Sequence, residues 1–318
     1  MDSIDIAILW DLGFDRQIPN RLGDRRPAVT KIATELGLDR RTVRSRIRRL
    51  ESEGFIKYYQ VYPNLEAAGL RASSYLLRFQ DYVSKNEALE RLKSLDQVLR
   101  VDVCLNSLRA TVAYTSQEQL EALVHSIESL TGSRPVKLYD FQMPRVSTKL
   151  DLTDWRIMAS LRYDALKSPA KIGKELGLTT RAVNYRLSRL ISARACLVAP
   201  VFDMREFAGT VIYGLMLQMD CSTIQTTVNS LKEAFGRASF CHIVNPNGNA
   251  MFMMFTDRIA EMEENYFKAR DMQGVKKVFV DVITGTHDCS RQMDQLIREK
   301  ISEKSKMRGN SFITAVPK

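Results

Sequence analysis

The sequence contains a dense run of arginines near its N-terminus, and arginine chemistry points to nucleic acid. Six arginines fall within ten consecutive positions: Arg40, Arg41, Arg44, Arg46, Arg48 and Arg49. A guanidinium donates to O6 and N7 of guanine together, and it also binds phosphate. Acidic residues are scarce inside the run, so we expect a polyanion to contact it. The alternative is a solvated helix face whose arginines pair with Glu51 and Glu53.

The element that positions these arginines is a predicted helix that begins after Asp39 as N-cap and ends near Glu53. Val43, Ile47 and Leu50 form its buried stripe, because they recur at helical spacing. A shorter predicted helix precedes it, which gives a helix-turn-helix whose second helix enters the major groove. A β-rich segment, residues 55–62, follows as a predicted wing hairpin. The candidate DNA contacts of this unit are Arg40, Arg41, Thr42, Arg44, Ser45, Arg48 and, on the wing, Lys57.

The unit occurs twice. Ile32-Ala-Thr-Glu-Leu-Gly-Leu38 recurs 140 residues later as Ile172-Gly-Lys-Glu-Leu-Gly-Leu178, and the register continues beyond it. Thr179 takes the N-cap position of the second copy. Its wing segment is apolar and contains Pro200, so we expect this unit to bind DNA more weakly or to serve mainly in packing. The candidate contacts in the second copy are Thr180, Arg181, Asn184, Tyr185 and Ser188, of which the asparagine suits adenine.

Each helix-turn-helix is followed by strand and helix signals in the order βαββαβ, the ferredoxin-like pattern. The predicted fold class is therefore α+β, with two tandem modules. The last strand of the second module is predicted over 275–283, and a final helix over about 291–304. The predicted domains are 1–62 and 147–202 for the winged helix-turn-helix units, 63–146 and 203–290 for the ferredoxin-like units, and 291–318 for a C-terminal helix and tail.

The first helix-turn-helix resembles the Lrp/AsnC family of archaeal and bacterial regulators. The resemblance rests on residues 32–38 and on Arg-Ile-x-x-Leu-Glu-x-x-Gly-Phe-Ile-Lys at 46–57, followed by the βαββαβ pattern. It implies a sequence-specific transcription regulator of double-stranded DNA that contacts the major groove mainly with its first recognition helix. It also implies pairing through the sheets and a small-molecule effector between them. The Gly-x-x-Asp signature that the family carries for amino acids is missing at 105–108 and 245–249.

Two other functions are consistent with the same fold. Siroheme decarboxylases resemble this family, but their His-Asn-Tyr-x-Arg motif is missing here. A sequence-blind architectural protein that coats DNA would also use a basic helix. There is no phosphate-binding loop, no Ser-His-Asp order and no HExxH motif, so we expect no enzyme activity and no cofactor.

Composition agrees with a globular DNA-binding protein. The chain has 318 residues, a formal net charge of +10, and no apolar run near the ~20 residues that span a bilayer. The N-terminus lacks a basic and apolar leader, so we expect a cytoplasmic protein without membrane contact. The five cysteines have no CxxC spacing, which predicts free thiols and no metal; a zinc site from Cys241-His242 and His287-x-Cys289 is the alternative.

Duplication changes the expected assembly. A single-copy relative must dimerise to present two recognition helices, whereas this chain already contains two. We expect the two sheets to pack on each other within the chain as a pseudo-dimer, because a short tether gives an effective concentration of about millimolar. If the linker at 143–149 prevents this, the sheets would pair between chains in a homodimer.

Overall fold

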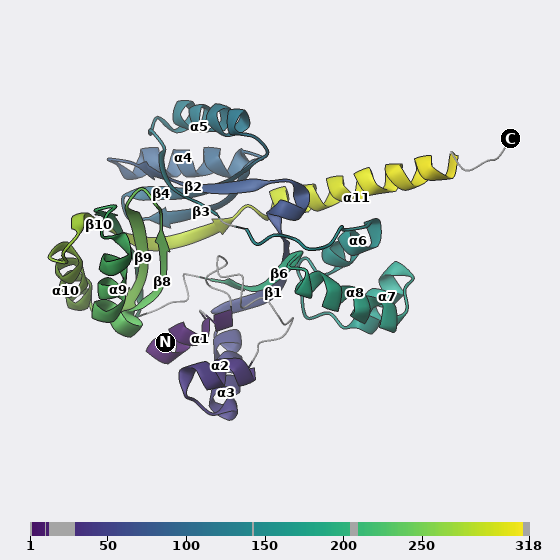
Figure 1. Ribbon diagram of the computed structural model, residues 1–318, viewed down its shortest axis with the longest axis horizontal. Helices are drawn as coiled ribbons and strands as arrows, with labels where there is room; N and C mark the ends of the chain where they lie inside the picture. Colours follow the sequence, from purple (N-terminus) through teal and green to yellow (C-terminus); the bar gives the residue numbers. More distant parts are fainter. Residues whose placement is uncertain (1, 10, 13–28, 142, 204–208, 314–318) are drawn as a thin grey trace.

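A computed structural model describes residues 2–9, 11–12, 29–141, 143–203 and 209–313. Two helical heads lie apart from each other, and strands join them to a larger sheet (Figure 1). The first head comprises α1 (Ser3–Leu9), α2 (Val29–Leu36), α3 (Arg40–Ser52) and β1 (Ile56–Pro63). The second head comprises α6 (Leu152–Ser160), α7 (Pro169–Leu176), α8 (Thr180–Ser192) and β6 (Cys196–Phe202).

The helix-turn-helix geometry follows from local sequence. Asp39 accepts a hydrogen bond from the backbone N–H of Thr42, and Thr179 accepts one from Ala182, as the two predicted N-caps require. Gly37 and Gly177 both take φ values near +65°, which let the chain turn between the two helices. Val43 is fully buried, and the apolar stripes of the two recognition helices belong to one continuous core that passes from head to head through β1 and β6.

The predicted wing hairpin is wrong. Residues 56–63 form one strand, β1, which pairs antiparallel with β6 of the other head in a two-stranded ribbon. The segment has no Gly or Asn turn inside it, so neither head can close a hairpin alone. Pro200 lies opposite Tyr59, where a strand with a free edge tolerates the missing N–H. The apolar character of β6 therefore reflects burial in the ribbon.

Two ferredoxin-like units are present, each with the strand order that the βαββαβ pattern requires. The first follows a short 3-10 turn (Leu65–Ala68), and a second such turn, Gly236–Ala238, precedes β8. The first unit contains β2 (Arg71–Arg78), α4 (Tyr82–Ser94), β3 (Val98–Cys104), β4 (Ser107–Tyr114), α5 (Gln117–Thr131) and β5 (Val136–Asp140). The second contains β7 (Val211–Met219), α9 (Ile224–Phe235), β8 (Ser239–Val244), β9 (Asn249–Thr256), α10 (Ile259–Arg270) and β10 (Val275–Asp288).

The two units form one eight-stranded sheet in the order β5-β2-β4-β3-β10-β7-β9-β8. The junction is an antiparallel ladder between β3 and the second half of β10, in which Thr286 lies opposite Asp102. Strand β10 is five residues longer than predicted, and this extension makes the junction. The two sheets are therefore in contact within one chain, joined edge to edge by this ladder, and the pseudo-dimer stays a prediction.

Smaller features of the sheet also agree with the sequence. Met251, Met253 and Met254 are buried on β9, as predicted for core residues. The predicted turn at 245–249 places Gly248 at φ +86°, where a Cβ would lie 2.4 Å from the backbone oxygen of Met219. Only glycine fits there without a backbone shift.

The last helix, α11 (Ser290–Ile313), begins against α6 of the second head and then extends away from the body (Figure 1). It is longer than the predicted 291–304. Arg162 fixes its start by an ion pair with Asp294, at 2.9 Å from Nε to Oδ1. Among the described residues, no helix is long and apolar enough to cross a membrane.

Candidate DNA interface

The arginines of α3 divide into two sets, and the inner set is structural. Arg46 and Arg49 both pair with Asp5, whose side chain is fully buried, and Arg46 also pairs with Asp2. The Arg46 Nη1 atom lies 2.9 Å from Asp5 Oδ1. These two arginines attach α3 to α1.

The second head repeats this cluster. Arg186 pairs with Asp151 and Asp154, and Arg189 pairs with Asp154, which is again fully buried. Burial raises the pKa of Asp151, but the hydrogen bond from Arg186 leads the opposing effects, so that pKa lies below its ordinary value. The structural ion cluster is therefore a shared property of both heads.

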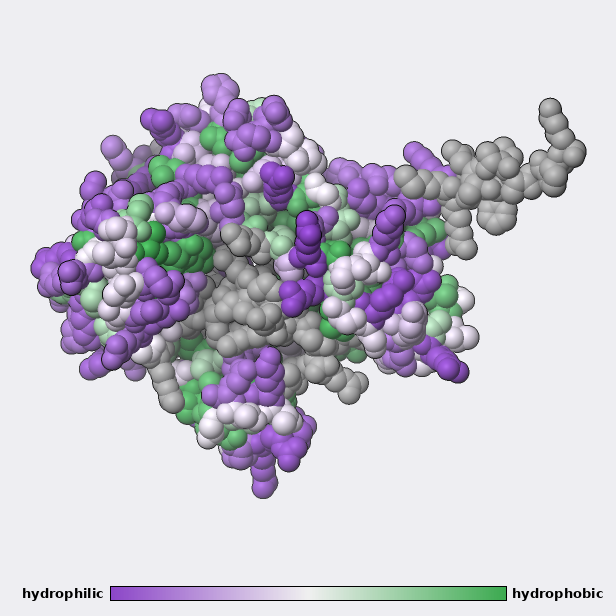
Figure 2. Space-filling model, viewed as in Figure 1, coloured by the Kyte–Doolittle hydropathy of each residue, from purple (hydrophilic) through white to green (hydrophobic). Residues whose placement is uncertain are grey.

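The outer set of α3 consists of Arg40, Arg41, Arg44 and Arg48, all of which are exposed. None of the four has an acidic partner in the part of the chain that the structure describes. Of the alternative pairing with Glu51 and Glu53, the described residues show one long contact, 3.9 Å, between Arg49 Nε and Glu53 Oε2. Hydrophilic side chains project from this end of the first head in Figure 2.

Two other predicted residues of α3 differ in their surroundings. Ser45 is exposed beside the outer arginines, as expected. Thr42 is only partly exposed, and its hydroxyl donates to Asp39 at the helix start. Thr42 therefore contributes to the helix cap, and its hydroxyl proton is already used there.

The corresponding face of α8 carries much less charge. Thr180, Arg181, Asn184 and Ser188 replace Arg40, Arg41, Arg44 and Arg48, so one arginine stands where the first head has four. All four are exposed, and so is Tyr185, with 69% of its surface accessible. This face offers hydrogen-bonding groups and an aromatic ring with little phosphate-binding capacity.

Lys57 lies in the β1–β6 ribbon instead of on a hairpin wing, and its contact with DNA stays a prediction. It lies on β1 in the ribbon, with its Nζ 2.6 Å from Asp203 Oδ2. The residue was assigned to DNA because a hairpin wing was expected there. Pairing of β1 with β6 instead turns this lysine toward a cavity.

Sequence reasoning missed the acidic partners of the inner arginines. The signal was present, because each head begins with Asp-x-x-Asp, at Asp2 and Asp5 and again at Asp151 and Asp154. In the second head this pair forms a reciprocal capping box at the start of α6. The pairs are 149 residues apart whereas the recognition helices are 140 apart, which hid the correspondence.

The zinc alternative involves Cys241-His242 and His287-x-Cys289. Among the described residues, no group of three His, Cys, Asp or Glu side chains could hold a metal ion. The side chain of Cys241 lies outside the described atoms. Cys104 and Cys196 are buried, as predicted.

Comparison with known proteins agrees with two DNA-binding heads. Residues 150–191 match the AsnC-type helix-turn-helix domain, and residues 24–57 match a winged helix-turn-helix DNA-binding domain. The HTH-type transcriptional regulator Ptr1 of Methanocaldococcus jannaschii is 29% identical over 101 residues, which are 32% of this chain and 62% of that protein. The chain thus spans less than two thirds of the length of this relative.

Solved structures resemble the chain either over nearly its whole length or over less than half of it. The siroheme decarboxylase NirDL is similar over 95% of this chain and 99% of its own, with a TM-score of 0.56 and 15% identity. At that identity the likeness shows the fold alone. The AsnC protein of E. coli matches 42% of this chain and 92% of its own, with a TM-score of 0.36 and 11% identity. With two matched helix-turn-helix domains, one of them AsnC-type, and a duplicated module, the chain is similar to proteins of the Lrp/AsnC type.

Proposed function

We propose that this protein is a transcription regulator that binds specific sites on double-stranded DNA, mainly through α3. The observation that supports this is the set of four exposed arginines on a capped recognition helix, none of which has an acidic partner among the described residues. Residues near the helix start, Arg40 to Arg44, are placed for base edges, and Arg48 for phosphate. The similarity to a named transcriptional regulator supports the same function.

We also propose that one chain acts as its own dimer. This chain contains two heads and two ferredoxin-like units that share one sheet. A single-copy relative would need two chains to supply the same parts. Because α3 and α8 differ at most of their exposed positions, the preferred DNA site should contain two unequal half-sites. We assign the chain to binding and not to catalysis, and to the cytoplasm, where its DNA would be.

Binding-site selection from random DNA tests this proposal. We expect one enriched sequence with a strong and a weak half-site, bound by one chain as measured by light scattering of the complex. Enrichment of no sequence above the starting pool would instead identify an architectural protein. A palindromic site that binds two chains would contradict the single-chain dimer.

Affinity should fall steeply with salt, because each phosphate contact releases condensed counterions. Each phosphate contact, of which Arg48 supplies one, should lower the affinity about three- to fourfold between 50 and 200 mM salt. Fluorescence anisotropy with the selected site and with a scrambled duplex measures this. A flat salt profile would mean that the arginine face does not meet phosphates.

A further inference from the structure

We propose that Arg162 is a positioning residue that fixes the second head on the rest of the molecule, so that the chain accepts DNA sites with one separation between half-sites. The effect on DNA rests on the proposed function, because only a protein that binds both half-sites responds to their separation. Arg162 lies in the loop between α6 and α7 and is 3% exposed. Its side chain joins this loop to the ribbon and to α11.

The first contact of the Arg162 side chain is with β1, the strand that belongs to the first head. Its Nη1 atom donates to Gln60 Oε1 at 2.6 Å and to the backbone oxygen of Val61 at 3.3 Å. The backbone continues this contact. The N–H of Val61 donates to the oxygen of Arg162 at 3.3 Å, and the N–H of Ala165 donates to the oxygen of Tyr59 at 3.0 Å. The loop of the second head is therefore bound along a strand of the first.

The second contact is with α11, the helix that follows the last strand of the sheet. Arg162 Nε lies 2.9 Å from Asp294 Oδ1, and the hydroxyl of Tyr163 donates to the other carboxylate oxygen. Figure 1 shows the start of α11 beside α6, and these two helices pack together. The second head is therefore attached to the C-terminal helix as well as to the ribbon.

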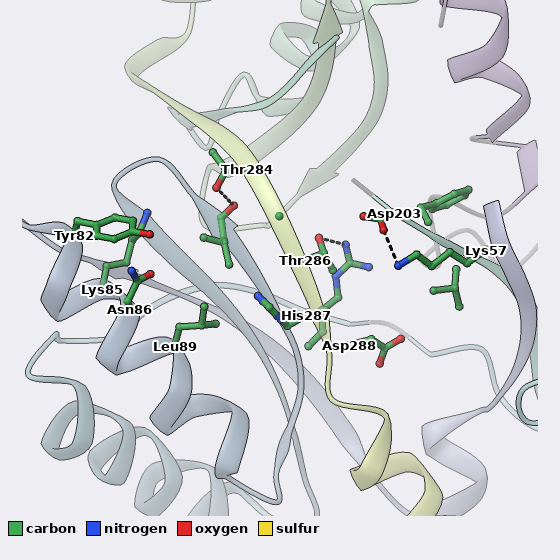
Figure 3. A pocket seen from close by; sticks show the side chains of 15 residues that line it. Lys57, Tyr82, Lys85, Asn86, Leu89, Asp203, Thr284, Thr286, His287 and Asp288 are labelled. Carbon is green, nitrogen blue, oxygen red and sulfur yellow. Dashed lines mark hydrogen bonds and ion pairs between the residues drawn. The ribbon is translucent and has the colours of Figure 1, made fainter. Parts of the chain in front are cut away.

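The sheet joins the same network through Asp288, the last residue of β10. Its carboxylate accepts hydrogen bonds from Tyr62 at 2.6 Å and from Gln60 at 3.2 Å, and Gln60 in turn accepts one from Arg162. Figure 3 shows Asp288 near the end of β10, where the chain turns toward α11. We call Arg162, Gln60, Asp288 and Asp294 the Arg162 network. It connects the second head, the ribbon, the sheet and α11.

Stability alone does not account for this arginine. Its Nη2 atom is buried without a hydrogen-bond partner among the described residues. The guanidinium lies over the rings of Tyr62 and Tyr163, with its central carbon 5.0 Å from each ring centroid. Apolar side chains of similar volume are often as stable as a buried ion pair. A planar guanidinium adds direction, because its donors fit one arrangement of their acceptors. We therefore expect Arg162 to restrict geometry.

The network is not a general requirement of this kind of head. At the spacing of 149 that relates the two Asp-x-x-Asp pairs, Gly13 stands where the second head has Arg162, although the adjacent Leu12 and Leu161 match. Helix α6 packs on α11 and β1, whereas α1, its counterpart, packs mainly on the other helices of its own head. The role of Arg162 therefore concerns the place of one head relative to the other.

A fixed second head sets the distance and the angle between the two recognition helices. B-DNA turns once in about 10–10.5 base pairs, so each base pair added between half-sites rotates one of them by about 35° and moves it about 3.4 Å. About five added base pairs place the half-sites on opposite faces of the duplex. A chain whose heads keep one separation can follow only small changes of this kind, and beyond them its second head loses its half-site.

A series of spacers tests this effect by anisotropy, with the half-sites of the selected duplex moved apart one base pair at a time, up to about half a helical turn. At about two added base pairs, wild type should lose the same factor in affinity as the variant with alanine at Arg181, Asn184 and Ser188. Arg162→Met should bind the original duplex within about threefold of wild type and lose much less of that factor as the spacer grows. Arg156→Met, at an exposed arginine of α6, is the matched control and should behave as wild type.

Distances between spin labels test the Arg162 network without DNA. Labels attached through p-acetylphenylalanine at Ser45 of α3 and Ser188 of α8 avoid the native cysteines. Double electron–electron resonance should give one narrow distance distribution in wild type and in Arg156→Met, and a broader one in Arg162→Met. Asp294→Asn should broaden it to a smaller degree. This second variant keeps the test valid if Arg162→Met unfolds, because the Asp294 side chain is partly exposed.

Three results would overturn the proposal: unchanged distances in both network variants, the same broadening in the control, or a spacer preference in Arg162→Met as narrow as in wild type. Equal binding of wild type to every spacer would also contradict it. If the distances broaden as expected but no duplex is bound specifically, the proposed function is refuted and the spacer effect with it, while the positioning role of Arg162 stands.

Discussion

Replacing Asp102 with alanine should lower the free energy of unfolding by about 3–5 kcal/mol, because it breaks a buried ion network. Asp102 and Arg109 are 5% and 7% exposed, and Arg109 donates to Asp102 Oδ2 from Nε and Nη2 at 3.0 and 2.8 Å. Arg100 and Thr286 donate to the other oxygen. Since Thr286 lies on β10, this carboxylate bridges the two ferredoxin-like units. Its removal leaves two guanidinium groups without their anion.

Urea unfolding of the full chain measures the loss. Asp96→Ala is the matched control, because Asp96 is exposed in the turn before β3, and we expect a change within about 0.5 kcal/mol. Arg109→Met should be milder than Asp102→Ala, since Asp102 keeps Arg100 and the new side chain meets Met251 and Met253. A loss below about 1 kcal/mol for Asp102→Ala would show that the network does not hold the units together.

The same carboxylate gives a pH signature. Burial raises the pKa of Asp102, but Arg100 and Arg109 outweigh it and hold that pKa below its ordinary value. A lowered pKa in the folded state means that the stabilisation is complete above the unfolded value of about 4 and is lost as the pH falls through the folded value. Wild type should therefore lose more stability than Asp102→Ala on acidification below about pH 4.

Local features of this chain could be predicted from the sequence, whereas contacts between its halves could not. Periodicity and capping chemistry predicted the shorter helix before α3, the caps at Asp39 and Thr179, and the order of strands and helices along both units. These depend on neighbours within a few residues. The β1–β6 ribbon joins segments about 140 residues apart, and a β-rich run does not specify its partner.

The extension of β10 was missed for a related reason. Residues 284–288 read Thr-Gly-Thr-His-Asp, and such polar residues do not suggest a strand. They are ordered because β3 offers a free edge and Asp102 offers an acceptor to Thr286. The candidate DNA interface shows the same division. Helical spacing predicted that the outer arginines are exposed, but it did not predict which acidic residues pair with the inner two arginines.

Replacing Arg41, Arg44 and Arg48 together with alanine should weaken binding to the selected DNA site on the order of a thousandfold or more, from about 1–3 kcal/mol per contact. The fold should persist, because these side chains are exposed and make no ion pair among the described residues. The matched control is a second triple variant, in which alanine replaces Arg181, Asn184 and Ser188 at the equivalent positions of α8. Since that face has one arginine, its loss should be much smaller and its salt dependence nearly unchanged.

Anisotropy titrations on the selected duplex and on scrambled DNA separate base contacts from phosphate contacts. Removal of Arg41 and Arg44 should reduce the ratio of specific to scrambled affinity, because residues near the helix start face base edges. Arg48→Ala alone should weaken both duplexes by a similar factor and lower the salt slope by about one. If the triple variant binds as wild type does, the α3 face is not the DNA interface. If the two triple variants lose equally, the heads contribute equally, and the unequal half-sites inferred from their charges are wrong.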